Sequence, residues 1–397
     1  MSLENYWVVY MNAPLIYFNN AATSWPKPNI VHDMVSSSFQ QPYHEHGRAT
    51  DENLNDYPKM TRKKLSDFFH IETPNNFIFT SNATDSLNLL IHGYTQSCGR
   101  KIHAITTELE HNSALRPLNT LQKQGAIDLT IIPFDDAGYV SLDAIRDEVR
   151  DTTKLVVMNH GSNVLGTTQD IGSIGQYLSE QNIFFVVDTA QTAGHLDIDL
   201  NKTAVDAIAF TGHKSLYGYQ GIGGLYIRDP EKVESYKQGG TGVYSQYPYH
   251  PTEMPLKFEF GTLNYPGIVS LYAGLDFIEA QGIRSMNEKT HSMIYHILKE
   301  LSPMENITLY TKQPDLPIIS FNIEGMDNDD VGFILQKEFN IMTRTGLHCA
   351  PLVHKRIDNG RGCIRVSLSY FNSMEECDTF INAIEKITKT IIATNTV

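Results

Sequence analysis

Short apolar runs alternate with longer amphipathic segments between residues 77 and 228. Seven runs lack the polar alternation of half-exposed strands, and they span residues 77–80, 103–107, 129–134, 154–159, 184–188, 207–212 and 223–228. Helical spacing fills several of the gaps, as at 85–94 and 173–182. This pattern predicts an α/β fold with a mostly parallel seven-stranded sheet, helices on both of its faces, and ligands at the carboxyl ends of the strands.

The pattern changes after about residue 267. Two strand-like runs and two helical patterns follow in alternation, at residues 316–325, 327–339, 362–370 and 373–392. Ser373 and Glu376 have the spacing of a capping box at the start of the last helix. We therefore expect a smaller α+β domain at the C-terminal end of the chain.

The predicted division gives a large domain of residues 16–267 and a small domain built from residues 1–15 and 268–397. Residues 237–265 are rich in Gly, Tyr and Pro, and we expect them to form an ordered loop. Loops of that length are usually functional.

Composition excludes several classes of protein. The 397 residues carry 31 basic and 45 acidic side chains, a net charge of −14, which argues against binding to a nucleic-acid backbone. No apolar run is long enough to span a bilayer, and residues 1–14 do not read as a secretory signal. The cysteines are widely spaced, so we expect no disulfides and a cytoplasmic location. His44 and His46 lack a third ligand nearby, so no metal site is predicted.

Polar residues follow five of the predicted strands. Ala83 and Thr84 lie at a strand-to-helix turn that could receive a phosphate, although an ordinary helix cap is the simpler reading of that turn alone. Asp188 ends a buried strand and needs a cationic or N–H partner, whereas Lys214 follows the next strand. An acid and a lysine at adjacent strand ends are the two anchors that pyridoxal phosphate requires.

Cys349 lies in the stretch TRTGLHCAPLVHK, residues 343–355. Taken alone, the stretch leaves three readings open: a packing residue, a metal ligand or a nucleophile. Cys98, Cys363 and Cys377 are interpreted as packing residues.

Eight segments in family order resemble the class V, fold-type I pyridoxal-phosphate enzymes, and within them the cysteine desulfurase and selenocysteine lyase group. The segments are residues 17–28, 80–88, 108–117, 162–167, 186–199, 209–226, 258–268 and 344–351. The resemblance implies the fold-type I transferase fold and pyridoxal 5'-phosphate as cofactor. Leu347 departs from the group, whose short-loop members usually have a histidine there.

The resemblance also implies how the cofactor is held. Lys214 would carry it covalently, Asp188 would pair with its ring nitrogen, and His111 would stack on the ring and assist proton transfer. The remaining contacts would come from Gln191, Asn163, Ala83, Thr84, Thr211 and His213, the last four forming a phosphate cup. Thr262 would reach the phosphate of a neighbouring subunit, which implies a homodimer.

For the substrate, the resemblance implies that Arg365 and Asn163 bind its carboxylate, with Arg344 ordering the cysteine loop and Arg48 at the rim. The implied reaction converts L-cysteine to L-alanine, forms a persulfide on Cys349 and passes it to an acceptor protein, for example in iron–sulfur assembly. Other class V reactions stay open: selenocysteine or cysteine sulfinate cleavage, C–S lysis or transamination. A scaffold without cofactor is disfavoured by the intact pair of Lys214 and Asp188.

Overall fold

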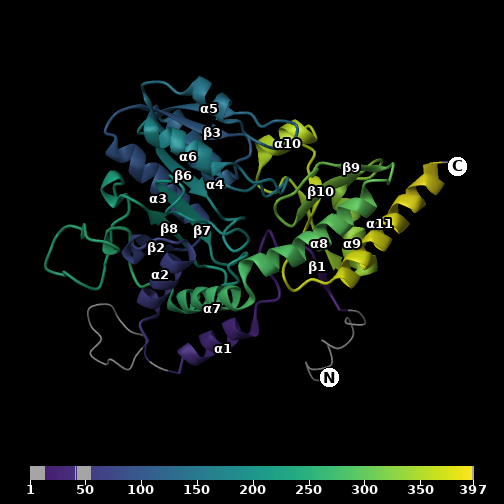
Figure 1. Ribbon diagram of the computed structural model, residues 1–397, viewed down its shortest axis with the longest axis horizontal. Helices are drawn as coiled ribbons and strands as arrows, with labels where there is room; N and C mark the ends of the chain where they lie inside the picture. The colour runs from purple at the N-terminus through teal and green to yellow at the C-terminus, as the bar shows by residue number, and fades with distance from the viewer. Residues whose placement is uncertain (1–13, 41, 43–54, 396–397) are drawn as a thin grey trace.

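A computed structural model describes residues 14–40, 42 and 55–395, and in it two sheets form the framework of the chain (Figure 1). The larger sheet has seven strands in the order β2-β8-β7-β6-β5-β3-β4. Their bounds are β2 (Phe77–Thr80), β3 (Ile102–Thr107), β4 (Ile127–Ile132), β5 (Thr153–Asn159), β6 (Phe184–Asp188), β7 (Ala207–Thr211) and β8 (Gly223–Ile227). Only β8 runs against its neighbours, so the predicted α/β fold with a mostly parallel sheet is confirmed.

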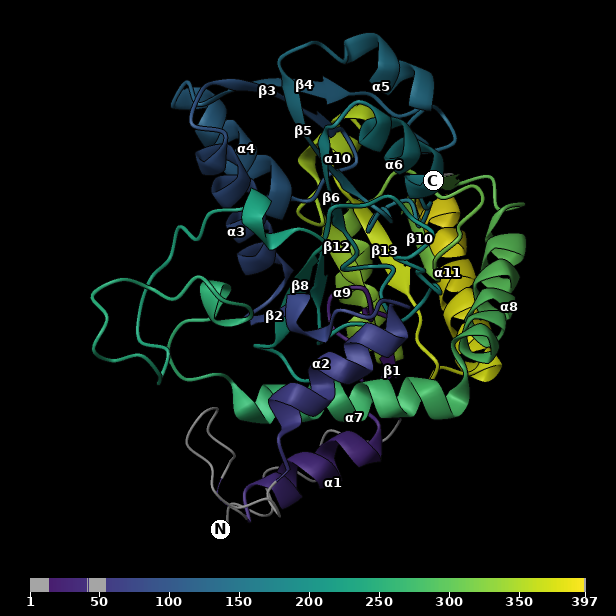
Figure 2. The same ribbon diagram turned by 60° about the vertical axis from the view of Figure 1, so that its left-hand side comes forward.

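Helices cover both faces of this sheet because successive residues of each buried strand point to opposite sides. On one face, Val157, Val186 and Ala209 pack with α3 (Ala83–Ser97) and α4 (Asn112–Lys123). On the other face, Met158 and Val187 belong to a second core. That core is completed by α2 (Tyr57–Phe68), α5 (Leu142–Glu148), α6 (Ile171–Glu180) and α7 (Tyr265–Gln281), with α1 (Asn29–Ser38) packed on α7 (Figure 2).

The smaller sheet is antiparallel, with the order β12-β13-β10-β9. Its strands are β9 (Ile307–Leu309), β10 (Ile318–Ile323), β12 (Arg344–Gly346) and β13 (Cys363–Ser367), and its helices are α8 (Ile283–Leu301), α9 (Asn328–Phe339) and α11 (Met374–Asn395). Ser373 and Glu376 form the capping box reciprocally, with backbone-to-side-chain distances of 3.0 and 3.2 Å. The short helix α10 (Pro351–Ile357) lies between the two sheets (Figure 1).

Packing at the ends of the large body differs from the sequence boundaries. Strand β1 (Ile16–Tyr17) pairs with β11 (Ile341–Met342), and Phe18 enters the core of the smaller sheet. Helix α7 packs on the larger body up to Ile278, and Gly282 separates it from α8. We therefore propose domain boundaries after residue 18 and at residue 282, rather than at 16 and 267.

The predicted loop of residues 237–265 is irregular except for a short 3₁₀ turn, Leu256–Phe258, and it extends away from the body (Figure 2). Two further 3₁₀ turns within the described residues are Pro74–Asn76 and Pro230–Lys232. Among the described helices, none combines the length and apolar content that crossing a bilayer requires. Residues 44, 46 and 48, singled out from the sequence, lie outside the described residues.

A buried ion pair anchors the end of this loop to the sheet. Arg62 donates to Glu259 at 2.6 Å and to the carbonyl of Phe77 at 3.0 Å, and both charged side chains are buried. Glu259 also accepts the backbone N–H of Phe79 at 2.9 Å. Each charge in this arrangement depends on the other for compensation.

Replacing Glu259 by Gln should destabilise the protein by about 3–5 kcal/mol, because it leaves the Arg62 guanidinium buried without a counter-charge. Urea unfolding followed by circular dichroism measures the change. Asp67→Asn, which breaks the exposed pair of Asp67 with Lys63, is the control, with an expected loss of at most about 1 kcal/mol. Equal losses in the two variants would contradict the prediction.

Candidate active site

A cavity of about 310 Å³ opens at the carboxyl edge of the larger sheet, facing the smaller one. Twelve of the site residues predicted from sequence line it: Ala83, Thr84, His111, Asn163, Asp188, Gln191, Thr211, His213, Lys214, Arg344, Cys349 and Arg365. Thr262 is exposed and does not line it. Both sheets therefore contribute to one site.

Asp188 and Lys214 stand at the ends of neighbouring parallel strands. Asp188 is the last residue of β6, and Lys214 follows the end of β7 by three residues. Burial lowers the pKa of Lys214 to about 8, although the charge of Asp188 acts in the opposite direction. Burial likewise raises the pKa of Asp188. The hydrogen bond from the Ala190 N–H at 2.9 Å and the charge of Lys214 lower this pKa but do not outweigh burial. Lys214 is thus an ammonium group that loses its proton close to neutral pH.

The start of α3 forms the anion-binding end of the cavity. Asn82 caps the helix by accepting the N–H of Asp85 at 3.0 Å, and Ala83 and Thr84 open the first turn, whose N–H groups have no intrahelical partner. A Cβ on Gly223 would lie 2.7 Å from the Cα of Asn82, so only glycine lets this turn approach β8 so closely. The geometry suits a phosphate.

Several buried polar atoms around the cavity have no protein partner among the described residues. They include Asn163 Oδ1, Thr211 Oγ1 and His213 Nδ1. Buried polar groups are nearly always satisfied, so atoms left in this state mark the places where a bound group makes its hydrogen bonds.

Arg365 adds a positive charge to the wall. Its side chain is 2% exposed, and it donates to the carbonyl of Asn163 at 3.0 Å and weakly to Asn19 at 3.4 Å, while its Nε stays unpaired. In the part of the chain that the structure describes, no carboxylate forms an ion pair with it. Burial lowers its pKa to about 10, and the neighbouring charge of Arg344 acts in the same direction. A carboxylate ligand would compensate this charge.

His111 caps α4 and faces the cavity. Its Nδ1 accepts the N–H of Ser113 at 3.1 Å, so the ring proton belongs on Nε2. Burial, followed by the charges of Lys214 and Arg365, lowers its pKa to about 4. The ring is therefore neutral near pH 7 and can donate from Nε2.

The cysteine loop joins β12 to α10 through two consecutive left-handed residues. His348 and Cys349 have φ of 51° and 57°, which costs energy for residues with a side chain. The larger body holds both carbonyls: Asn163 donates to that of His348 at 2.7 Å, and the N–H of Asn112 donates to that of Cys349 at 2.7 Å. These bonds keep the exposed Cys349 at the cavity wall.

Other lining residues had no role in the sequence analysis. They include Asn82, Ser113, Asn159, Ala21 and Ala22. Asn82 could have been found as the cap residue of its turn, whereas Ala21 and Ala22 reach the cavity by long-range packing. Leu347, where the group usually has a histidine, is 43% exposed. Thr241 and Tyr244, in the projecting loop, do not line the cavity.

The donor set fits pyridoxal phosphate. It offers a lysine near deprotonation, a buried carboxylate one strand away, a helix N-terminus with unpaired hydroxyl and imidazole atoms, and a neutral histidine. Lys214 would hold the aldehyde carbon, Asp188 the ring nitrogen, and the turn at Ala83 the phosphate.

Comparison with known proteins agrees with this geometry. The profile of the family described as Aminotransferase class-V matches residues 16–380. A probable cysteine desulfurase of Pyrococcus abyssi is 32% identical, with 95% of each chain covered. A cysteine desulfurase of Escherichia coli O157:H7 is 28% identical, with 94% of this chain and 93% of the relative covered. The apo structure of a cysteine desulfurase from Thermococcus onnurineus superposes with a TM-score of 0.88 at 32% identity, covering 95% of each chain.

In cofactor-free protein, an amine-selective reagent should acylate Lys214 at a rate whose pH midpoint lies near 8. Burial lowers its pKa to about 8, and only the unprotonated amine reacts. Asp188→Asn should move the midpoint to lower pH, since the lost negative charge had stabilised the ammonium form. Peptide mass spectrometry across pH gives the midpoint. The exposed variant Asp143→Asn is the control, and a midpoint that does not move in Asp188→Asn would refute the proposed coupling.

Proposed function

We propose that the chain converts L-cysteine to L-alanine with pyridoxal 5'-phosphate as cofactor. The premise is its family: the chain belongs to the Aminotransferase class-V family and to its cysteine desulfurase group. The observation that carries the proposal is the meeting of three groups in one cavity: Lys214, Asp188 and Cys349. An amine, a buried acid and a thiol serve one reaction that removes sulfur from an amino acid.

Substrate binding follows from the charges on the wall. Arg365 would fork the carboxylate of L-cysteine with its two terminal nitrogens, and Asn163, which accompanies it, would add an amide contact. Arg344 lies at the start of the cysteine loop and lines the same cavity.

Proton transfer at the substrate falls to Lys214. When bound, pyridoxal phosphate supplies an electron sink that makes the Cα proton of the substrate acidic. Lys214 Nζ, with its pKa lowered to about 8, would take this proton and return it. Asp188 would hold the proton of the ring nitrogen in place. His111 would cover the ring, and Gln191, whose amide donates to the carbonyl of Ala21 at 3.1 Å, would present its oxygen to the ring hydroxyl.

Sulfur leaves by attack of Cys349. As a thiolate, its Sγ would form a bond to the substrate sulfur while the substrate C–S bond breaks. The electron pair of that bond stays with the substrate carbon, which is protonated to give alanine. Cys349 retains the sulfur as a persulfide, and an acceptor protein would then take it, for example for iron–sulfur assembly. The exposure of Cys349 supports such a handover.

A homodimer would complete the phosphate site. Thr262 is exposed and lies outside the cavity of its own chain, at the end of the projecting loop. Tyr247 and Tyr249 on this loop are 63% and 83% exposed, a surface that a second copy would cover.

All four cysteines are free, which supports a reducing compartment such as the cytoplasm.

Exposure of the protein to L-cysteine should add one sulfur to Cys349, detectable by peptide mass spectrometry, and reductant should then release sulfide. Cys349→Ala should lose at least about 100-fold of this release while it still binds the cofactor, because the nucleophile is absent. Unchanged sulfide release in Cys349→Ala would exclude the persulfide route.

Two further measurements separate the remaining reactions. Lys214→Ala should lose the absorbance band of the covalently held cofactor together with all turnover. Selenocysteine or cysteine sulfinate cleavage that survives in Cys349→Ala would favour a lyase over a sulfur transferase.

A further inference from the structure

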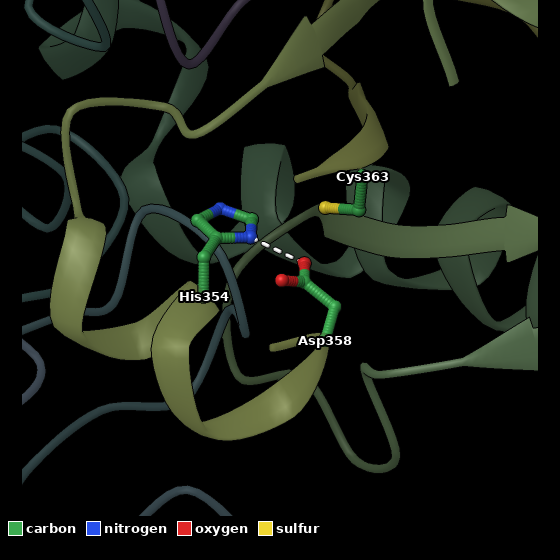
Figure 3. A group of neighbouring side chains, drawn as sticks. All are labelled: His354, Asp358 and Cys363. Atoms are coloured by element: carbon green, nitrogen blue, oxygen red, sulfur yellow. Dashed lines mark hydrogen bonds and ion pairs between the residues drawn. The ribbon is translucent and has the colours of Figure 1, made fainter. Parts of the chain in front are cut away.

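Behind the cysteine loop, three side chains from α10 and β13 form a buried polar cluster (Figure 3). His354 and Asp358 are 0% and 1% exposed, and their Nδ1 and Oδ2 atoms are 2.6 Å apart. The sulfur of Cys363 points toward the pair, and the three groups offer atoms within 4.8 Å of one another. Burying an imidazole and a carboxylate costs free energy unless each forms a hydrogen bond with the other or with a neighbouring group.

The cluster favours hydrogen bonding over metal binding. His354 Nδ1 and the Asp358 carboxylate, which would be two of the ligands, already bond to each other. Burial raises the pKa of Cys363 to about 12, so its sulfur is a neutral thiol. A structural zinc takes four ligands, and this group offers three.

The unpaired atoms of the cluster point to a neighbour of the nucleophile. His354 Nε2 and both ring nitrogens of His348 are buried without a partner in the described part of the chain. The two imidazole rings lie 5.4 Å apart between centroids, tilted by 53°. Because Asp358 fixes the His354 proton on Nδ1, His354 Nε2 is left as an acceptor. No hydrogen bond joins the two rings in the described structure, but a turn of the His348 ring would let its N–H donate to His354 Nε2.

We propose that Asp358 and His354 are positioning residues that fix the tautomer of His348, so that its other ring nitrogen stays unprotonated beside Cys349. One proton lies between Asp358 and His354, and a turn of the His348 ring would place a second between His354 and His348. The remaining nitrogen of His348, which lines the cavity with Cys349, is then a proton acceptor. This inference rests on the proposed use of Cys349 as a nucleophile.

The relay gives the thiol proton a destination. As Cys349 becomes a thiolate, its S–H bond breaks, the electron pair stays on sulfur, and the proton moves to the free nitrogen of His348. The resulting imidazolium donates to His354 Nε2, and the Asp358 carboxylate stabilises the charge through the second ring. Burial is the main factor that lowers the pKa of His348, and the charges of Arg365, His354 and Arg344 act in the same direction. The Asp358 carboxylate is the negative group of the cluster that would compensate the imidazolium.

The backbone of the loop makes this arrangement specific. The left-handed pair His348–Cys349 has both of its carbonyls held from the larger body, so the His348 ring has little freedom to leave His354. Helix α10 is itself fixed to the larger body, since Arg356 donates to Glu108 at 3.2 Å and its guanidinium lies over the ring of Phe134.

The test uses Asp358→Asn, which keeps the shape but removes the charge and permits the other tautomer. In the holoenzyme, kcat for sulfide release should fall about 10- to 100-fold while KM for L-cysteine stays within about twofold, because Arg365 is untouched. Carboxamidomethylation of Cys349 at pH 7 without substrate should slow by a similar factor. His348→Gln should slow it equally, and the double variant should be no slower than either single one.

Asp378→Asn is the matched control, because it changes an exposed His–Asp pair, His296 with Asp378 at 2.7 Å, and it should leave both rates unchanged. Unchanged alkylation in Asp358→Asn, losses that multiply in the double variant, or an equal loss in the control would overturn the proposal. So would one zinc per chain in the purified wild type that is absent from Asp358→Asn. Wild-type protein that releases no sulfide would refute the proposed function alone, because alkylation of Cys349 needs no substrate.

Discussion

Parallel strands present their carboxyl ends at one edge of a sheet, and this constraint brings the acid, the lysine and the phosphate-binding turn together. Asp188 and Lys214 are neighbours because β6 and β7 are neighbours, and α3 starts its free N–H groups at the same edge because β2 runs in the same direction. The antiparallel β8 between β2 and β7 contributes Gly223, whose missing side chain leaves room for the turn.

The smaller sheet brings the proposed nucleophile and the proposed carboxylate-binding cation to the cavity. Arg365 and Arg344 are paired residues on adjacent antiparallel strands, so one register places both at the cavity. The cysteine loop follows β12 directly, and its strained backbone is held by carbonyl bonds from Asn163 and Asn112. Because these donors also stand beside the cofactor-binding groups, any shift between the two bodies changes the position of the thiol and of the substrate contact together.

The larger sheet was predictable because buried strands read as apolar runs, and several of them are followed by polar residues that line the cavity. Residue contacts made across long sequence separations were not predictable in this way. His348 looked like a flank of Cys349, and its role emerges only when α10 turns His354 toward it. Cys363 was correctly interpreted as buried, but its closeness to His354 and Asp358 depends on the pairing of β12 with β13. The domain boundary expected at residue 267 stays a prediction, and we propose residue 282 because α7 packs on the core of the larger body.

The buried charge of Arg365, which has no carboxylate partner among the described residues, has a consequence for stability. A guanidinium that is 2% exposed and faces no described carboxylate lowers the stability of the fold until an anion arrives. Selection for thermostability alone would replace it with an aliphatic side chain, and the protein would then gain heat resistance and lose its proposed contact with the substrate carboxylate. The residue is therefore a point of trade-off between stability and activity, and ligand occupancy in the cell becomes one of the determinants of how long each molecule survives.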